Sequence, residues 1–107
     1  MIDDEIDYCM IMENFFVQQN YDVKLAFTIQ DGLERLATYG PDILILDNNL
    51  PDGRGWDHVE SIVEKNPHLK IFLISAYSNK EIAEKYVSPN ITILEKPLSF
   101  KLLKNYF

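Results

Sequence analysis

Apolar and polar positions follow two different periods along this chain, and the two periods alternate. Residues 43–46 form a continuous run of isoleucine and leucine, and residues 70–75 are nearly as apolar, which is typical of strands covered on both faces. Between such runs, apolar residues recur at spacings of three and four, which predicts helices with one buried face. Repeated β-then-α units give a parallel sheet with helices on both faces. The sequence therefore predicts an α/β fold.

The predicted elements can be placed from this pattern and from capping and turn signals. Residues 21–27 alternate strictly, which predicts an edge strand whose covered face carries Tyr21, Val23, Leu25 and Phe27. Five strands are expected, at residues 1–2, 21–27, 43–46, 70–75 and 91–94. The first expected helix follows the acidic cluster at 3–5 and turns Tyr8, Ile11, Met12 and Phe15 toward the core. Three further helices are expected, from Thr28 to Gly40, from Gly55 to Lys65 and from Ser78 to about Tyr86. A last helix is expected to begin at Ser99.

The two ends of the chain are short for the elements they should form. Only Met1 and Ile2 precede the acidic cluster, whereas a strand usually has about five residues. Either residues are lacking at the start or the first strand is stunted, and the last helix stops at Phe107. We expect one domain over residues 1–107, trimmed at both ends.

Composition narrows the function classes. The 107 residues are 47% apolar, enough for one real core, and carry a net charge of −7, which disfavours direct nucleic-acid binding because a phosphate backbone would be repelled. Cys9 is the single cysteine, so no intrachain disulfide can form. There is no apolar stretch long enough to span a membrane and no signal-peptide pattern. A cytoplasmic setting without membrane attachment is expected.

Polar side chains stand where the predicted strands end. The carboxyl ends of parallel strands share one edge of the sheet, where ligands bind. Three carboxylates that meet there need a compensating charge, and an all-oxygen set suits Mg²⁺ or Mn²⁺. Asp47 is then a candidate nucleophile for a phosphoryl group, with Lys96 and Ser75 positioned to hold phosphoryl oxygens. The residues at the strand ends are Asp3, Asp4, Asp47, Ser75, Glu95 and Lys96.

These residues and their order resemble the receiver domain of two-component response regulators, over essentially the whole chain. The resemblance implies a flavodoxin-like, doubly wound sheet of five parallel strands in the order 2-1-3-4-5. It makes Asp47 the phospho-acceptor, with Ser75 and Lys96 in catalytic roles. It assigns the metal to Asp3, Asp4, Asp47 and the backbone carbonyl of Asn49, and it implies a cis peptide bond between Lys96 and Pro97.

The resemblance also implies partners and a switching mechanism. A sensor histidine kinase or a phosphotransfer protein would donate the phosphoryl group with Mg²⁺ present, and the surface around the fourth helix, fifth strand and fifth helix would change for a partner or an output domain. The domain would catalyse its own phosphorylation and dephosphorylation without being an enzyme in the usual sense, as a monomer or weak homodimer. Ile93 stands where many relatives have an aromatic switch residue, and Tyr77 stands at a position that tunes hydrolysis.

Two other interpretations remain open at this point. The same fold could serve as an interaction module that works without phosphorylation. The complete set of phosphorylation-site residues argues against this interpretation. A magnesium-dependent phosphohydrolase would carry a second acid two residues after its nucleophile, as general acid or base, and Asn49 occupies that place. The phosphohydrolase is therefore the weaker alternative.

Overall fold

The computed structural model describes residues 1–76 and 88–107. The helix predicted from Ser78 to about Tyr86 and the tuning position Tyr77 lie outside these ranges. In the described part, helices and parallel strands alternate along the chain as the sequence predicts, so the α/β class is confirmed. No helix in that part combines the length and the apolar character that crossing a membrane requires.

Three regular strands form the central sheet. They are β1 (Ile43–Asp47), β4 (Lys70–Ser75) and β5 (Ile91–Glu95), in the order β1-β4-β5, and both pairs are parallel. The register aligns Asp47 with Ile74 and Ser75 with Glu95. The carboxyl ends of all three strands therefore lie at one edge of the sheet.

The first predicted strand is reduced to a single bridging residue. Ile2 forms parallel bridges to Ala26 on one side and to Leu46 on the other. Its N–H donates to the carbonyl of Ile45 at 2.8 Å, and the N–H of Asp3 donates to the carbonyl of Ala26 at 3.0 Å. Ile2 thus lies between Ala26 and β1, but the predicted count of five regular strands is not confirmed.

The prediction for residues 21–27 is wrong in detail. No regular strand forms there, and Ala26, assigned to the uncovered face, is the one residue of the stretch that is buried. Tyr21 is exposed, while Val23, Leu25 and Phe27 are half-buried. The reason is that a strand needs a neighbour for its ladder. Among the described residues, residues 1–3 supply the cross-strand backbone hydrogen bonds of this stretch, and these lie near Ala26.

The helices of the described residues are α1 (Ile6–Gln18), α2 (Ile29–Tyr39), a 3₁₀ turn (Gly55–His58), α3 (Val59–Lys65) and α5 (Phe100–Leu103). The single helix predicted from Gly55 to Lys65 is thus a 3₁₀ turn followed by α3. The capping signals of α2 and α5 are confirmed. Thr28 accepts a hydrogen bond from the Asp31 N–H at the start of α2, and Gly40 ends this helix with φ of +64°. Ser99 caps α5 through the Leu102 N–H. A short hairpin that the sequence did not predict, β2 (Asn49–Leu50) and β3 (Gly53–Arg54), follows β1.

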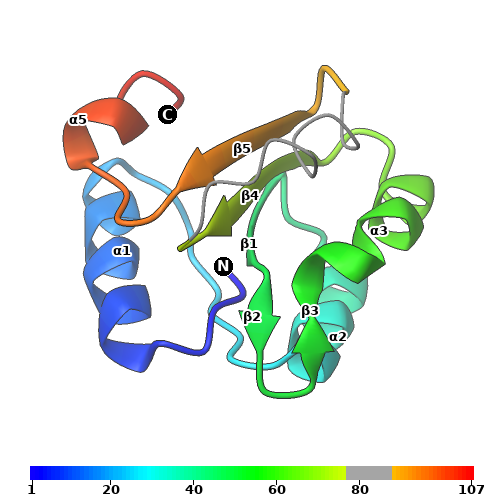
Figure 1. Ribbon diagram of the computed structural model, residues 1–107. Helices are drawn as coiled ribbons and strands as arrows, with labels where there is room; N and C mark the ends of the chain where they lie inside the picture. Colours follow the sequence, from blue (N-terminus) through cyan, green and yellow to red (C-terminus); the bar gives the residue numbers. More distant parts are fainter. Residues whose placement is uncertain (77–87) are drawn as a thin grey trace.

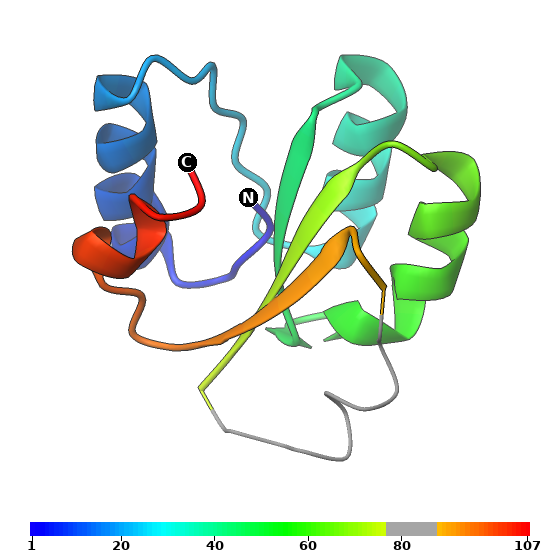
Figure 2. The same ribbon diagram turned by 90° about the horizontal axis from the view of Figure 1, so that it is seen from above.

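The helices cover both faces of the sheet. Figures 1 and 2 show α1 and α5 on one side and α2 and α3 on the other. Alternate residues of the strands supply two separate cores: Leu44 and Leu46 of β1 pack with the α2 and α3 side, and Ile45 packs with the α1 and α5 side. This two-sided burial explains the continuous apolar strands. One prediction for α1 fails here, because Ile11 is 55% exposed rather than turned toward the core.

Candidate functional site

Three carboxylates converge at the carboxyl end of the sheet. Asp3 and Asp4 directly follow Ile2, and Asp47 is the last residue of β1. The N–H of Asp47 donates to the Ile2 carbonyl at 2.9 Å, which fixes the two segments side by side. One oxygen from each of the three side chains lies within 4.8 Å of the others. Asp3 and Asp47 are buried, with exposed fractions of 0% and 3%, whereas Asp4 faces solvent.

The Asp3 carboxylate is held from two sides. Its Oδ1 accepts a hydrogen bond from the Glu5 N–H at 2.9 Å, at the start of α1. Its Oδ2 is fully buried and forms an ion pair with the Lys96 Nζ at 2.7 Å. A carboxylate oxygen has two lone pairs, so Asp3 Oδ2 can also contact a cation.

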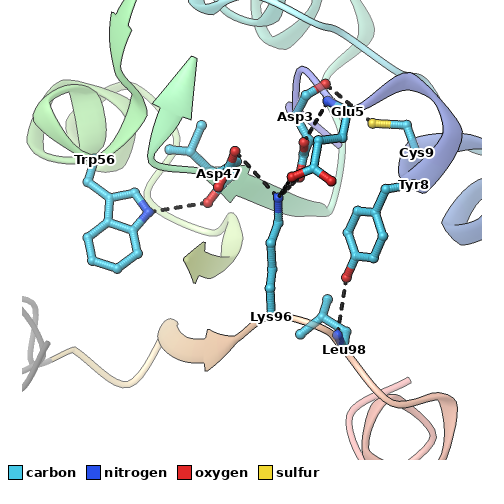
Figure 3. A network of polar contacts seen from close by, with 9 residues as sticks. Asp3, Glu5, Tyr8, Cys9, Asp47, Trp56, Lys96 and Leu98 are labelled. Carbon is cyan, nitrogen blue, oxygen red and sulfur yellow. Dashed lines mark hydrogen bonds and ion pairs between the residues drawn. The ribbon is translucent and has the colours of Figure 1, made fainter. Parts of the chain in front are cut away.

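Lys96 brings an ammonium to this cluster from the far end of the chain. Figure 3 shows its side chain reaching from the segment after β5 into the space between the acids. Its Nζ lies 2.7 Å from Asp3, 3.1 Å from Glu5 and 3.5 Å from Asp47. Burial disfavours its charge, but the contacts with Asp3 and Glu5 outweigh that effect and raise the pKa of Lys96 above its ordinary value. The lysine is therefore charged at neutral pH.

Asp47 is the acid whose ionisation the fold opposes. Burial, and secondarily the charge of Asp3, raise its pKa from 3.8 to about 6, and the neighbouring Lys96 only partly reverses this. A nearby cation stabilises the ionised form of a buried carboxylate beside a second carboxylate more than it stabilises that of a solvated carboxylate. The three acids together thus form a cluster that could hold a hard divalent cation.

The loop after β1 folds back tightly against the Asp47 backbone. The Gly55 N–H donates to the Asn48 carbonyl at 2.9 Å, and the Trp56 ring N–H donates to the Leu46 carbonyl at 3.3 Å (Figure 3). A Cβ added at Gly55 would overlap the backbone oxygen of Asp47. Only glycine permits this approach, which sets the loop beside the acidic cluster.

Comparison with known proteins identifies this arrangement. The family model described as response regulator receiver domain matches residues 1–107. This chain is a member of the response regulator receiver domain family. The protein is 28% identical over 105 residues to the response regulator protein PilR of Pseudomonas aeruginosa, in an alignment covering 97% of this chain and 24% of PilR.

Solved structures support the same fold. A CheY-like receiver domain from Methanospirillum hungatei has a TM-score of 0.89 at 20% identity, over 98% of this chain and 85% of that one. A CheX-CheY-BeF₃-Mg²⁺ complex from Borrelia burgdorferi has a TM-score of 0.86 at 20% identity, over 98% and 82% of the two chains. As a receiver domain of two-component response regulators, the chain belongs to a family of phosphorylation-dependent signalling proteins.

Receiver domains generally bind Mg²⁺ at an acidic pocket, and the residues present here fit that ion. The set is all oxygen, it includes the buried carboxylates of Asp3 and Asp47, and the exposed Asp4 leaves the site open to water on one side. Asn49 lies exposed in β2, two residues beyond Asp47. The role of the Asn49 backbone carbonyl as a ligand of the metal stays a prediction.

The other predicted site residues lie at or near the same edge. Ser75 ends β4, is 8% exposed, and accepts the Lys96 N–H at its carbonyl at 2.8 Å. The bond between Lys96 and Pro97 is cis, as predicted. Ile93 is half-buried in β5, paired with Leu73 and two residues before the strand end. The geometry gathers Asp3, Asp4, Asp47 and Lys96, and the functional roles of Ser75 and Ile93 stay predictions.

Sequence reasoning missed three contributors. Glu5 was counted only within the acidic cluster, yet it contacts Lys96. The Tyr8 ring was expected only in the core, but it lies 5.1 Å from the Lys96 Nζ, and its hydroxyl accepts the Leu98 N–H at 3.2 Å. The Asp52 carboxylate, in the turn between β2 and β3, accepts N–H groups at the start of α2. These contacts join distant residues, and no local sequence signal marks them.

Proposed function

We propose that Asp47 accepts a phosphoryl group from a phosphohistidine of a histidine kinase or a phosphotransfer protein, with Mg²⁺ assistance. One observation carries the proposal: the buried carboxylate of Asp47 shares a single edge with two further carboxylates and one ammonium. In this step an oxygen of Asp47 attacks phosphorus, the bond between phosphorus and the imidazole nitrogen breaks, and the imidazole retains the bonding electron pair. The product is an aspartyl phosphate.

Each neighbouring residue has a task in this transfer. Asp3, Asp4 and the Asn49 carbonyl would hold the Mg²⁺ beside Asp47, and the ion would offset the negative charge that gathers during transfer. Lys96 balances the charge of one phosphoryl oxygen from the other side, which its 3.5 Å distance from Asp47 supports. The Ser75 hydroxyl, at the end of the adjacent strand, donates to another oxygen.

The consequence of phosphorylation is a change in the surface that a partner or output domain contacts. This surface would comprise β5, α5 and the fourth helix that the sequence predicts, which lies outside the described residues. A phosphoryl group adds charge locally and shifts the population of two arrangements of the domain. The related structure from Borrelia burgdorferi is a CheX-CheY complex with BeF₃ and Mg²⁺, which supports the same chemistry here. The chain spans about a quarter of the length of PilR, so the output of a whole protein is left open.

The proposal is tested with acetyl phosphate as donor. We expect the intact mass of the protein to rise by one phosphoryl group when Mg²⁺ is present, and to stay unchanged with a chelator. The Asp47→Asn variant should gain no mass, whereas Asp57→Asn, which alters an exposed acid of the 3₁₀ turn, should behave as wild type. A folded wild-type protein that gains no mass with any small phosphoryl donor would favour the phosphorylation-independent interaction module.

A further inference from the structure

The acid next to the metal pair has a function that the family assignment does not supply. We infer that Glu5 is a positioning residue that competes with the phosphoryl group for Lys96 and thereby weakens the phosphorylated state. This inference rests on the proposed function of Asp47. It starts from the three distances around the ammonium, of which the one to Asp47 is the longest.

The contacts of Lys96 keep its ammonium on the α1 side of the site. Asp3 at 2.7 Å and Glu5 at 3.1 Å both precede α1, and the ring of Tyr8 in the first turn of that helix lies 5.1 Å away. Asp47, at the end of β1, is 3.5 Å away. An ammonium has three donors. In the unphosphorylated protein, Glu5 accepts one N–H donor of the Lys96 ammonium that a phosphoryl oxygen on Asp47 would need.

Glu5 differs from Asp3 in a way that suits a tuning role. Asp3 is fully buried, so its pairing with Lys96 is part of the folded site. The Glu5 side chain is 63% exposed, and among the described residues its carboxylate pairs with Lys96 alone. Solvent screens such a pair and limits its strength. Loss of the Glu5 charge should therefore leave the fold and the Asp3–Lys96 pair intact while releasing one donor.

The test measures the affinity of beryllofluoride, a phosphoryl analogue, at saturating Mg²⁺. We expect Glu5→Gln to bind beryllofluoride about two- to fivefold more tightly than wild type, the range that an exposed ion pair of this kind supports. A merely structural role would weaken binding on substitution rather than strengthen it. Glu60→Gln is the matched control, since Glu60 is an exposed glutamate in α3, and it should bind as wild type does.

A second background separates competition for Lys96 from simple repulsion between Glu5 and the anion. If Glu5 acts through the ammonium, the gain from Glu5→Gln disappears when Lys96→Met is also present. If the gain persists with Lys96→Met, or if Glu5→Gln alone binds no more tightly than wild type, the inference is wrong. Failure of wild type to bind beryllofluoride at all would contradict the proposed function instead, so the two failures are distinguishable.

Discussion

At the scale of single residues, the environment of Asp47 works against its charge. Its pKa is raised to about 6, first by burial and then by the charge of Asp3. The folded protein therefore binds a proton at Asp47 more readily than the unfolded chain does. Asp47 therefore stabilises the folded state fully at pH values below its unfolded pKa near 4, and this stabilisation is lost as the pH rises through about 6. Ionised Asp47 thus costs stability unless a cation is bound.

The first prediction follows from this cost. Without Mg²⁺ at about pH 8, Asp47→Asn should raise the free energy of unfolding by on the order of 1–3 kcal/mol, because a neutral amide replaces a buried carboxylate. At about pH 4 the difference should nearly vanish, since Asp47 is then protonated. Urea unfolding at the two pH values measures it. If Asp47→Asn changes the free energy of unfolding by the same amount at both pH values, the burial of the Asp47 charge is not electrostatically costly.

Gly55 gives a second prediction at this scale. In Gly55→Ala the added Cβ would overlap the Asp47 carbonyl oxygen, so backbone near the site must move. We expect a loss of stability of about 1–3 kcal/mol together with slower phosphorylation by acetyl phosphate. Gly40→Ala is the control, because Gly40 has φ of +64° and no neighbouring atoms within 4 Å of an added Cβ. It should lose stability at an unchanged phosphorylation rate in the folded protein.

At the scale of elements, one side chain connects the hairpin after β1 to a distant helix. The Asp52 carboxylate, in the turn between β2 and β3, accepts the Ile29 N–H at 2.8 Å and the Gln30 N–H at 3.0 Å. These hydrogen bonds lower the pKa of Asp52. An acid with a lowered pKa stabilises the fold above its unfolded pKa, and the effect is lost as the pH falls through the folded value.

We therefore expect Asp52→Ala to lower the melting temperature by a few degrees at neutral pH. The difference from wild type should shrink in acid as Asp52 becomes protonated. Thermal melts followed by circular dichroism across pH measure this. Asp57→Ala, an exposed acid in the 3₁₀ turn, is the control and should melt with wild type. A pH-independent effect of Asp52→Ala would mean that charge at the helix N-terminus does not matter.

The sequence was informative for elements whose stability is local or strongly patterned. The apolar run of β4 and the caps Thr28, Gly40 and Ser99 appear where predicted, because burial on two faces and capping leave clear marks. The strand predicted over residues 21–27 does not form, because an alternating sequence forms a strand only when a neighbouring strand is available to pair with. The acidic cluster was predictable since parallel strand ends meet, whereas the Glu5–Lys96 contact depends on side chains 91 residues apart.

At the scale of the whole molecule, the metal site should couple folding to Mg²⁺. The cation would bind the folded chain, where three acids meet, and not the unfolded one, where they are separated. We expect millimolar Mg²⁺ to raise the stability of wild type by about 1 kcal/mol, visible as a higher melting temperature. Asp4→Asn should abolish the increase, while Asp7→Asn, an exposed acid in the first turn of α1, should retain it.

A comparison with monovalent salt separates specific Mg²⁺ binding from a general effect of ionic strength. If monovalent salt at equal ionic strength raises the melting temperature as much as Mg²⁺ does, the increase comes from screening of the net charge of −7 and not from a specific site.

The account depends most on which residue carries the phosphoryl group. After reaction with a phosphoryl donor and Mg²⁺, reduction of the acyl phosphate with borohydride marks the modified residue permanently, and tandem mass spectrometry of peptides identifies it. We predict that the mark lies on Asp47 and is absent when Mg²⁺ is removed. A mark on another acid, such as Asp52 or Asp4, or an Asp47 mark that forms equally well without the cation, would contradict the account.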